Sequence, residues 1–166
     1  MFIFSLYLIS TIIFMPFMVL LHEFGHAIIA LLFTKGPVHI NLGNRNLNKS
    51  MTIGRIKIIF RGYTSILDIS FGQVFWGEIK GAKKRILVFL GGPLISLVLA
   101  LITLLIIMNF KFTLIVKIIL RSISLYSFNQ FLITIIPIEY KFQPYNEMKS
   151  DGYRIREILS KYKFNK

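Results

Sequence analysis

The 166-residue chain is too apolar for a typical soluble domain, with 55% hydrophobic residues and a mean hydropathy of +0.67. It has no cysteine, which excludes disulfides and thiolate metal sites, so any metal must be held by its three histidines or seven acidic residues. The net charge of +13 comes from Lys and Arg residues that lie mostly between the apolar runs. The sequence contains no recognisable nucleic-acid recognition module. We therefore expect a multi-span membrane protein whose partner is the lipid bilayer and not nucleic acid.

The first apolar run, residues 2–33, is long enough to cross a bilayer, and Pro16 is expected to kink it. This run contains no Lys or Arg, and Glu23 is its only acidic residue. His22 and His26 lie on either side of Glu23. Polar groups of this kind are costly inside a membrane, so the cluster is by default a candidate functional site.

The next segment, residues 38–75, predicts a small β-sheet. Apolar and polar residues alternate in 38–42 and 55–58, and 66–75 is rich in β-forming residues. Glycine-containing turns separate these stretches. We expect three or four strands.

Two further apolar runs, residues 86–110 and 112–138, complete a set of three predicted transmembrane helices. An amphipathic helix is expected at about 153–162. The predicted fold class is an α-helical membrane protein with three transmembrane helices. A small cytoplasmic-side β-sheet is inserted between the first and second helices, and a short C-terminal helix follows the third. We expect one domain over residues 1–166.

Basic residues predict the orientation. Ten Lys or Arg lie in residues 34–85 and seven follow residue 138, whereas only Lys111 lies between the second and third spans. The positive-inside rule places the N-terminus outside and the β-rich loop and C-terminal tail in the cytoplasm. We therefore expect a multi-pass protein of a cell membrane, with its polar cluster towards the cytoplasm. The Ile-, Lys- and Asn-rich usage is compatible with a bacterial source.

Residues 22–26 have the sequence His-Glu-Phe-Gly-His, which is the H-E-x-x-H pattern of many zinc hydrolases. On a helix, His22 and His26 share one face, so both imidazoles can reach one Zn²⁺ at about 2.0–2.1 Å. Zinc lowers the pKa of a bound water towards about 7, and Glu23 can take the proton of this water during attack on a carbonyl. The alternative is that both histidines are buried and only pack the helix.

A catalytic zinc usually has three protein ligands. Spacing alone does not select the third from the remaining candidates: His39, Asp68, Glu78, Glu139, Glu147, Asp151 and Glu157. Asp151 has the advantage that Gly152 allows a close backbone approach, and it follows the third span on the predicted cytoplasmic side. Gly91-Gly92-Pro93 predicts close packing of the second helix, which would let it approach the metal helix.

These motifs together resemble the site-2 protease family of intramembrane zinc metalloproteases. Residues 22–26 resemble the H-E-x-x-H of the first core helix of that family. Gly92-Pro93 resembles its second-helix Gly-Pro, and Asp151-Gly152 resembles the Asp-Gly after its third helix. The ordered set spans essentially the whole chain. Ser96 stands where many members have Asn.

The resemblance implies that His22, His26 and Asp151 bind one Zn²⁺ and that Glu23 is the general base. It implies hydrolysis of peptide bonds in membrane-anchored protein substrates, which the β-rich segment would dock as an extended strand. One alternative is a catalytically inactive membrane scaffold that binds a peptide or protein partner, and the intact Glu23 argues against it. A zinc enzyme acting on a lipid or small molecule is a third hypothesis, against which the predicted sheet argues.

Overall fold

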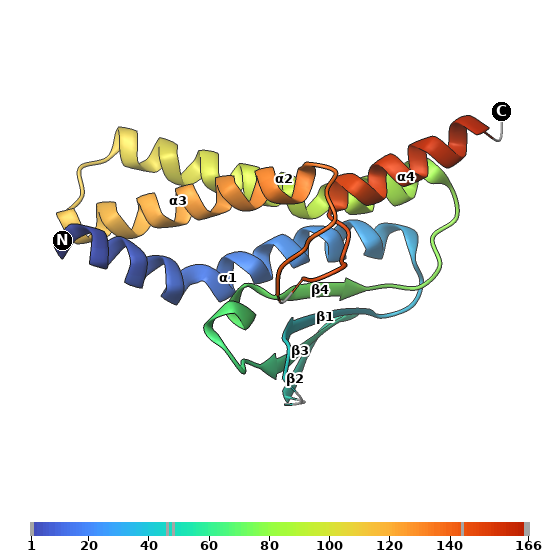
Figure 1. Ribbon diagram of the computed structural model, residues 1–166, viewed down its shortest axis with the longest axis horizontal. Coiled ribbons are helices and arrows are strands. Elements are labelled where there is room, and N and C mark those ends of the chain that lie inside the picture. The colour runs from blue at the N-terminus through green and yellow to red at the C-terminus, as the bar shows by residue number, and fades with distance from the viewer. Residues whose placement is uncertain (1, 46, 48, 144, 165–166) are drawn as a thin grey trace.

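The computed structural model describes residues 2–45, 47, 49–143 and 145–164. Three long helices lie side by side, and a small sheet packs beneath one end of the first (Figure 1). A fourth helix continues from the far end of the third and lies against the start of the second (Figure 1). The helices are α1 (Phe2–Phe33), α2 (Ala82–Asn109), α3 (Leu114–Ile135) and α4 (Asp151–Phe164).

The three long helices confirm the predicted apolar helices, with shifted ends. Each is long and apolar enough to cross a membrane. α1 has the predicted bounds and contains Pro16. α2 begins at Ala82, before the predicted residue 86, because its first turn consists largely of basic residues that an apolar pattern does not detect. α3 ends at Ile135 because Ile136, the residue before Pro137, is extended, as residues before proline favour.

α1 and α2 approach each other closely at a pair of glycines. A Cβ on Gly25 would lie only 2.3 Å from the carbonyl oxygen of Gly91. A Cβ on Gly91 would likewise lie 2.3 Å from the carbonyl oxygen of Gly25. Any side chain at either position would force the helices apart. Small residues commonly permit such contacts between membrane helices. This contact holds the half of α1 that carries His22 and His26 against α2.

The sheet has four strands in the order β2-β3-β1-β4. β1 pairs in parallel with β3 and antiparallel with β4, which leaves β4 at one edge. The expected three or four strands are present, but the stretch 66–75, which is rich in β-forming residues, forms a strand only in its second part, because its first part is a short 3-10 helix. The bounds are β1 (Val38–Gly43), β2 (Lys49–Ile53), β3 (Ile56–Gly62), η1 (Ile66–Ser70) and β4 (Gly72–Phe75).

The apolar core lies between the second half of α1 and the sheet. Val19 and Ala27 of α1 pack in one cluster with Val38 and Ile40 of the central strand β1. By contrast, many large apolar side chains on the outer faces of the three long helices are exposed, such as Met108 at 72%. An apolar exterior of this extent is typical of a surface covered by lipid.

Candidate metal centre

His22, His26 and Asp151 form a compact group at the junction of α1 and α4. The two Nε2 atoms are 3.3 Å apart. Asp151 Oδ2 lies 3.5 Å from His22 Nε2 and 3.3 Å from His26 Nε2. All three side chains are largely shielded from solvent. Of the candidates left open by the sequence, the structure therefore brings Asp151 to the two histidines.

The spacing of these three atoms fits a tetrahedral metal ion. Ligands about 2.0–2.1 Å from a tetrahedral ion lie about 3.3 Å from one another. The observed separations of 3.3, 3.5 and 3.3 Å match that edge length. Within the part of the chain that the structure describes, this is the group of histidine and acidic residues that could hold a metal ion.

The other ring nitrogens of both histidines have hydrogen-bond partners on α2. His22 Nδ1 lies 2.9 Å from Ser96 Oγ, and His26 Nδ1 lies 2.7 Å from the Val88 carbonyl oxygen. The Gly92 N–H also lies 3.3 Å from His26 Nδ1, but the shorter contact is to a carbonyl, which can only accept, and it favours the tautomer with the proton on Nδ1. Ser96 Oγ lies 3.4 Å from Gln130 Oε1, to which it can donate while it accepts from His22. Both Nε2 lone pairs then face Asp151, which is the arrangement of metal-binding histidines with supporting hydrogen bonds.

Gly92 makes room for the two imidazoles. A Cβ at this position would lie 2.2 Å from His26 Nε2 and 2.6 Å from His22 Nε2. Pro93 follows inside α2, where the missing N–H disturbs the hydrogen bonds of the preceding turns. The predicted close approach of α2 to α1 is present, and at Gly92 it occurs beside the Nε2 atoms of the two candidate ligands.

Asp151 owes its position to the start of α4. Ser150 accepts a hydrogen bond from the Tyr153 N–H through Oγ, at 3.1 Å, and so caps the helix. Ser150 Oγ also donates to the Ile136 carbonyl oxygen at 2.7 Å, which ties α4 to the end of α3. α4 thus begins at Asp151 and not at about 153 as predicted. Gly152 is required here, since a Cβ would lie 1.8 Å from the Ile135 carbonyl oxygen.

Glu23 lies beside the metal group and under the first residue of β4. Its side chain is 8% exposed, and a Cβ on Gly72 would be 2.7 Å from its Oε1. Glu23 lines the same cavity as the three candidate ligands, and this cavity measures about 480 Å³. Residues of β4, α3, α4 and the 138–150 loop, which joins α3 to α4, complete its wall. A carboxylate and a metal group therefore share one pocket large enough for a peptide segment.

The remaining candidate ligands have other surroundings. Asp68 is buried in η1, where its carboxylate accepts hydrogen bonds from Thr64 and from the Ser65 N–H. The hydroxyl and N–H of Thr64, together with Ser65, hold the pKa of Asp68 below its usual value. Glu157 forms an ion pair with Lys149 at 2.7 Å. None of the others, His39, Glu78, Glu139 and Glu147, belongs to the described metal group.

Sequence reasoning singled out Ser96 without giving it a role, and it missed the supporting residues Gln130 and Val88. A signal existed for Ser96, which is one turn after Gly92 and hence on the same face of α2. No pattern pointed to Gln130, because only the packing of α3 against α2 brings it near Ser96. Val88 acts through its backbone carbonyl, which its residue type does not reveal.

Comparison of the chain with protein-family models, with curated proteins and with solved structures finds no match in any of the three.

Proposed function

We propose that this protein is an intramembrane zinc metalloprotease similar to the site-2 protease family. Its substrates would be membrane-anchored proteins. The observation that carries the proposal is the tetrahedral spacing of His22, His26 and Asp151 beside Glu23. The two histidines and Glu23 lie in α1, which is long and apolar enough to cross a membrane. This combination favours hydrolysis, because a metal group and a general base face one cavity.

Zinc is the metal that the ligand set favours. Two imidazole nitrogens and one carboxylate oxygen at tetrahedral spacing are typical of catalytic zinc sites with an open fourth position. Zinc would supply Lewis acidity and a lowered pKa of bound water. His22 and His26 would hold the ion, Ser96 and Val88 would fix the orientation of their rings, and Glu23 would accept the proton of the attacking water.

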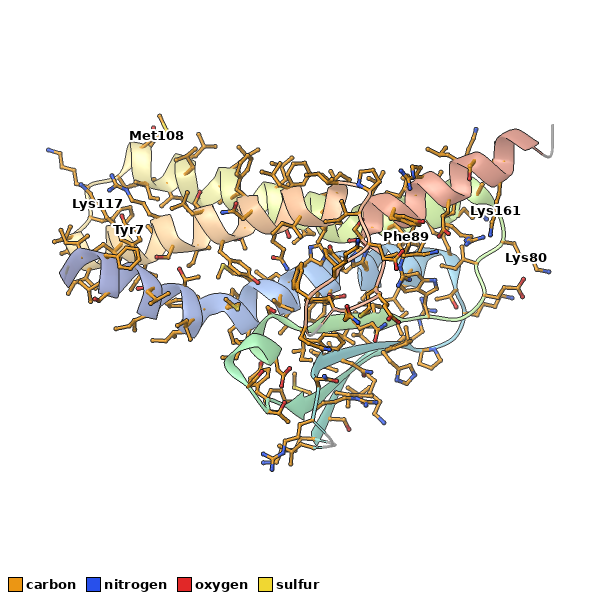
Figure 2. All side chains as sticks on the ribbon, in the orientation of Figure 1. Tyr7, Lys80, Phe89, Met108, Lys117 and Lys161 are labelled. Carbon is orange, nitrogen blue, oxygen red and sulfur yellow. The ribbon has the colours of Figure 1, made fainter. Side chains whose placement is uncertain are left out.

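The charge distribution supports a position towards the cytoplasm. Lys80 and Lys161 lie at the end of the molecule nearer the sheet and α4, whereas Lys117 lies at the opposite end (Figure 2). The ten basic residues of 34–85, and those after residue 138 that the structure describes, belong to the sheet, the start of α2, α4 and the segments that join these elements. By the positive-inside rule, the end nearer the sheet and α4 faces the cytoplasm of what we propose is a bacterial cell membrane, and the N-terminus lies outside.

The edge strand β4 offers a way to hold a peptide. Gln73, Val74 and Phe75 line the cavity that contains Glu23 and the metal group. An extended peptide paired with this edge would have its backbone unwound beside Glu23, as cleavage of a helical segment requires. A protein substrate is therefore favoured over a lipid or small molecule.

The test compares zinc content and cleavage of a single-span reporter in lipid nanodiscs. We expect one zinc per chain in the wild type. Glu23→Gln should retain zinc and lower the cleavage rate by about 10²–10⁴-fold, because it removes the general base. Asp151→Asn should lose zinc. Glu157→Gln is the matched control, since it makes the same kind of change in a carboxylate of α4 that pairs with Lys149.

Three outcomes would contradict the proposal. A zinc-free wild type would exclude the metal centre, and full cleavage by Glu23→Gln would exclude the general base. A wild type that binds zinc and a partner peptide without cutting it would instead favour the scaffold, especially if Glu23→Gln left peptide binding unchanged.

A further inference from the structure

The 138–150 loop crosses from the end of α3 to the sheet and returns to α4 (Figure 1). The two arms of the loop are joined by backbone hydrogen bonds. The Tyr140 N–H donates to the Met148 carbonyl oxygen at 2.9 Å, and the Ser150 N–H donates to the Ile138 carbonyl oxygen at 3.0 Å. Tyr145 lies near the tip of this loop. The described residues of the loop therefore place one aromatic side chain against β4.

Hydrogen bonds of β1 determine which groups of β4 face the cavity. The Val38 N–H donates to Arg55 on the β3 side, and the Gly43 N–H donates to Phe71 on the β4 side. These directions alternate along a strand, so the N–H and C=O groups of residues 39, 41 and 43 point towards β4. They bond to residues 75, 73 and 71, which are their partners in register. The N–H and C=O groups of Gly72 and Val74 must then point away from the sheet, along its open edge.

Tyr145 occupies one of these two outward positions. Its hydroxyl accepts a hydrogen bond from the Gly72 N–H at 3.2 Å and donates one to the Ser70 carbonyl oxygen at 2.5 Å. Its ring packs on Phe71 with centroids 5.2 Å apart. Burial raises the pKa of Tyr145 well above its usual value, so the hydroxyl remains a donor. Among the described residues, no comparable group bonds to the outward N–H or C=O of Val74, which lines the cavity.

We propose that Tyr145 is a specificity-determining residue that sets the register in which an extended substrate pairs with β4. Its hydroxyl stands where a substrate peptide group would otherwise bind Gly72. This inference rests on the proposed function, because it assumes that the occupant of the edge is a substrate backbone. Pairing is thereby restricted to Val74, and one segment of the substrate is presented to Glu23 and the metal group.

Removal of the hydroxyl should allow a second register. Outward-facing residues of a strand recur every two positions, so a substrate that pairs with Gly72 instead of Val74 is displaced by two residues. Tyr145→Phe keeps the ring that packs on Phe71 and removes the hydrogen bonds to Gly72 of β4 and to Ser70 of η1. Tyr140→Phe is the matched control, because the Tyr140 hydroxyl donates to Ile133 of α3, at 3.2 Å, and not to the sheet.

Engineered disulfides can measure the register without catalysis. The chain has no cysteine, so Phe75→Cys in a Glu23→Gln background provides one reactive thiol next to Val74. Single cysteines are scanned along the single-span reporter. We expect one reporter position to cross-link when Tyr145 is present, and a second position two residues away in Tyr145→Phe. Tyr140→Phe should give the original pattern.

Hydrogen exchange provides a second measurement on the unaltered protein. The Gly72 amide should exchange more slowly than the Val74 amide, and Tyr145→Phe should accelerate Gly72 exchange by about fivefold through loss of one hydrogen bond. Equal exchange at the two amides of the unaltered protein would overturn the proposal, as would an unchanged cross-linking register in Tyr145→Phe. These outcomes differ from failure of the proposed function, which would leave cross-linking intact and abolish only the Glu23-dependent cleavage.

Discussion

The two halves of α1 are both strongly apolar, but their surroundings differ. None of residues 3–17 is buried, and Phe4 and Ile13 are 73% and 63% exposed. From Met18 onwards one face of the helix is enclosed, with Val19 at 1%, His22 at 3% and His26 at 4%, while Leu32 on the other face is exposed. All the charged and imidazole side chains of α1 lie in the enclosed half. Polar groups therefore occur where protein, and not lipid, covers the helix.

The enclosing elements also provide the hydrogen-bond partners of the polar groups. α2 supplies Ser96 and the Val88 carbonyl to the histidines, and β4 covers Glu23. In the exposed half, the contact with α3 includes a long hydrogen bond from Ser122 Oγ to the Tyr7 carbonyl oxygen, at 3.4 Å. Changes around the enclosed half should thus affect metal binding, and changes around the exposed half should affect little.

The largest effect is expected for Gly92→Ala. A Cβ 2.2 Å from His26 Nε2 and 2.6 Å from His22 Nε2 cannot be accommodated unless both rings leave their positions, so the purified protein should lose its zinc. Zinc per chain, measured after purification in detergent, checks the result. Val98→Ala is the control, since Val98 lies on the same helix and is 47% exposed. Normal zinc content in Gly92→Ala would show that the imidazoles bind no metal in this arrangement.

A smaller effect is expected for Ser96→Ala. The substitution removes the partner of His22 Nδ1 and frees the ring to rotate, while the ligand atom remains. Loss of such a supporting hydrogen bond typically weakens metal affinity by about 10–100-fold. Competition with a zinc chelator measures it. Thr103→Ala removes a buried hydroxyl that bonds within α2, to Leu99 O at 2.7 Å, and should leave the affinity unchanged.

The smallest effect is expected for Ser122→Ala, beside the exposed half of α1. Ser122 Oγ donates chiefly to Ile118 of its own helix, at 2.9 Å, so its loss should lower the free energy of unfolding by roughly 0.6 kcal/mol. Thermal unfolding in nanodiscs checks this, and zinc content should not change. A loss of zinc in Ser122→Ala would break the distinction between the two halves.

Local patterns were sufficient to predict the three long helices and the common orientation of His22 and His26 on α1. Apolar run length predicted α1, α2 and α3, and the helical repeat placed His22 and His26 on one face. Patterns were insufficient at 66–75, where β-forming residues predicted strand. There the carboxylate of Asp68 accepts the N–H groups of Thr64 and Ser65, and these bonds hold the segment in a short helix.

The sequence by itself determined the chemical inventory: no cysteine, two histidines and a glutamate in one apolar helix, and a list of possible third ligands. Tertiary structure brought Asp151, which the motif resemblance already implied, to the two histidines, because the capped start of α4 and the contact of Gly152 with α3 fix its position. It also decided that Ser96 orients His22 and that Tyr145 covers the edge of β4. These contacts join residues far apart in the chain, and no local repeat or spacing encodes such distances.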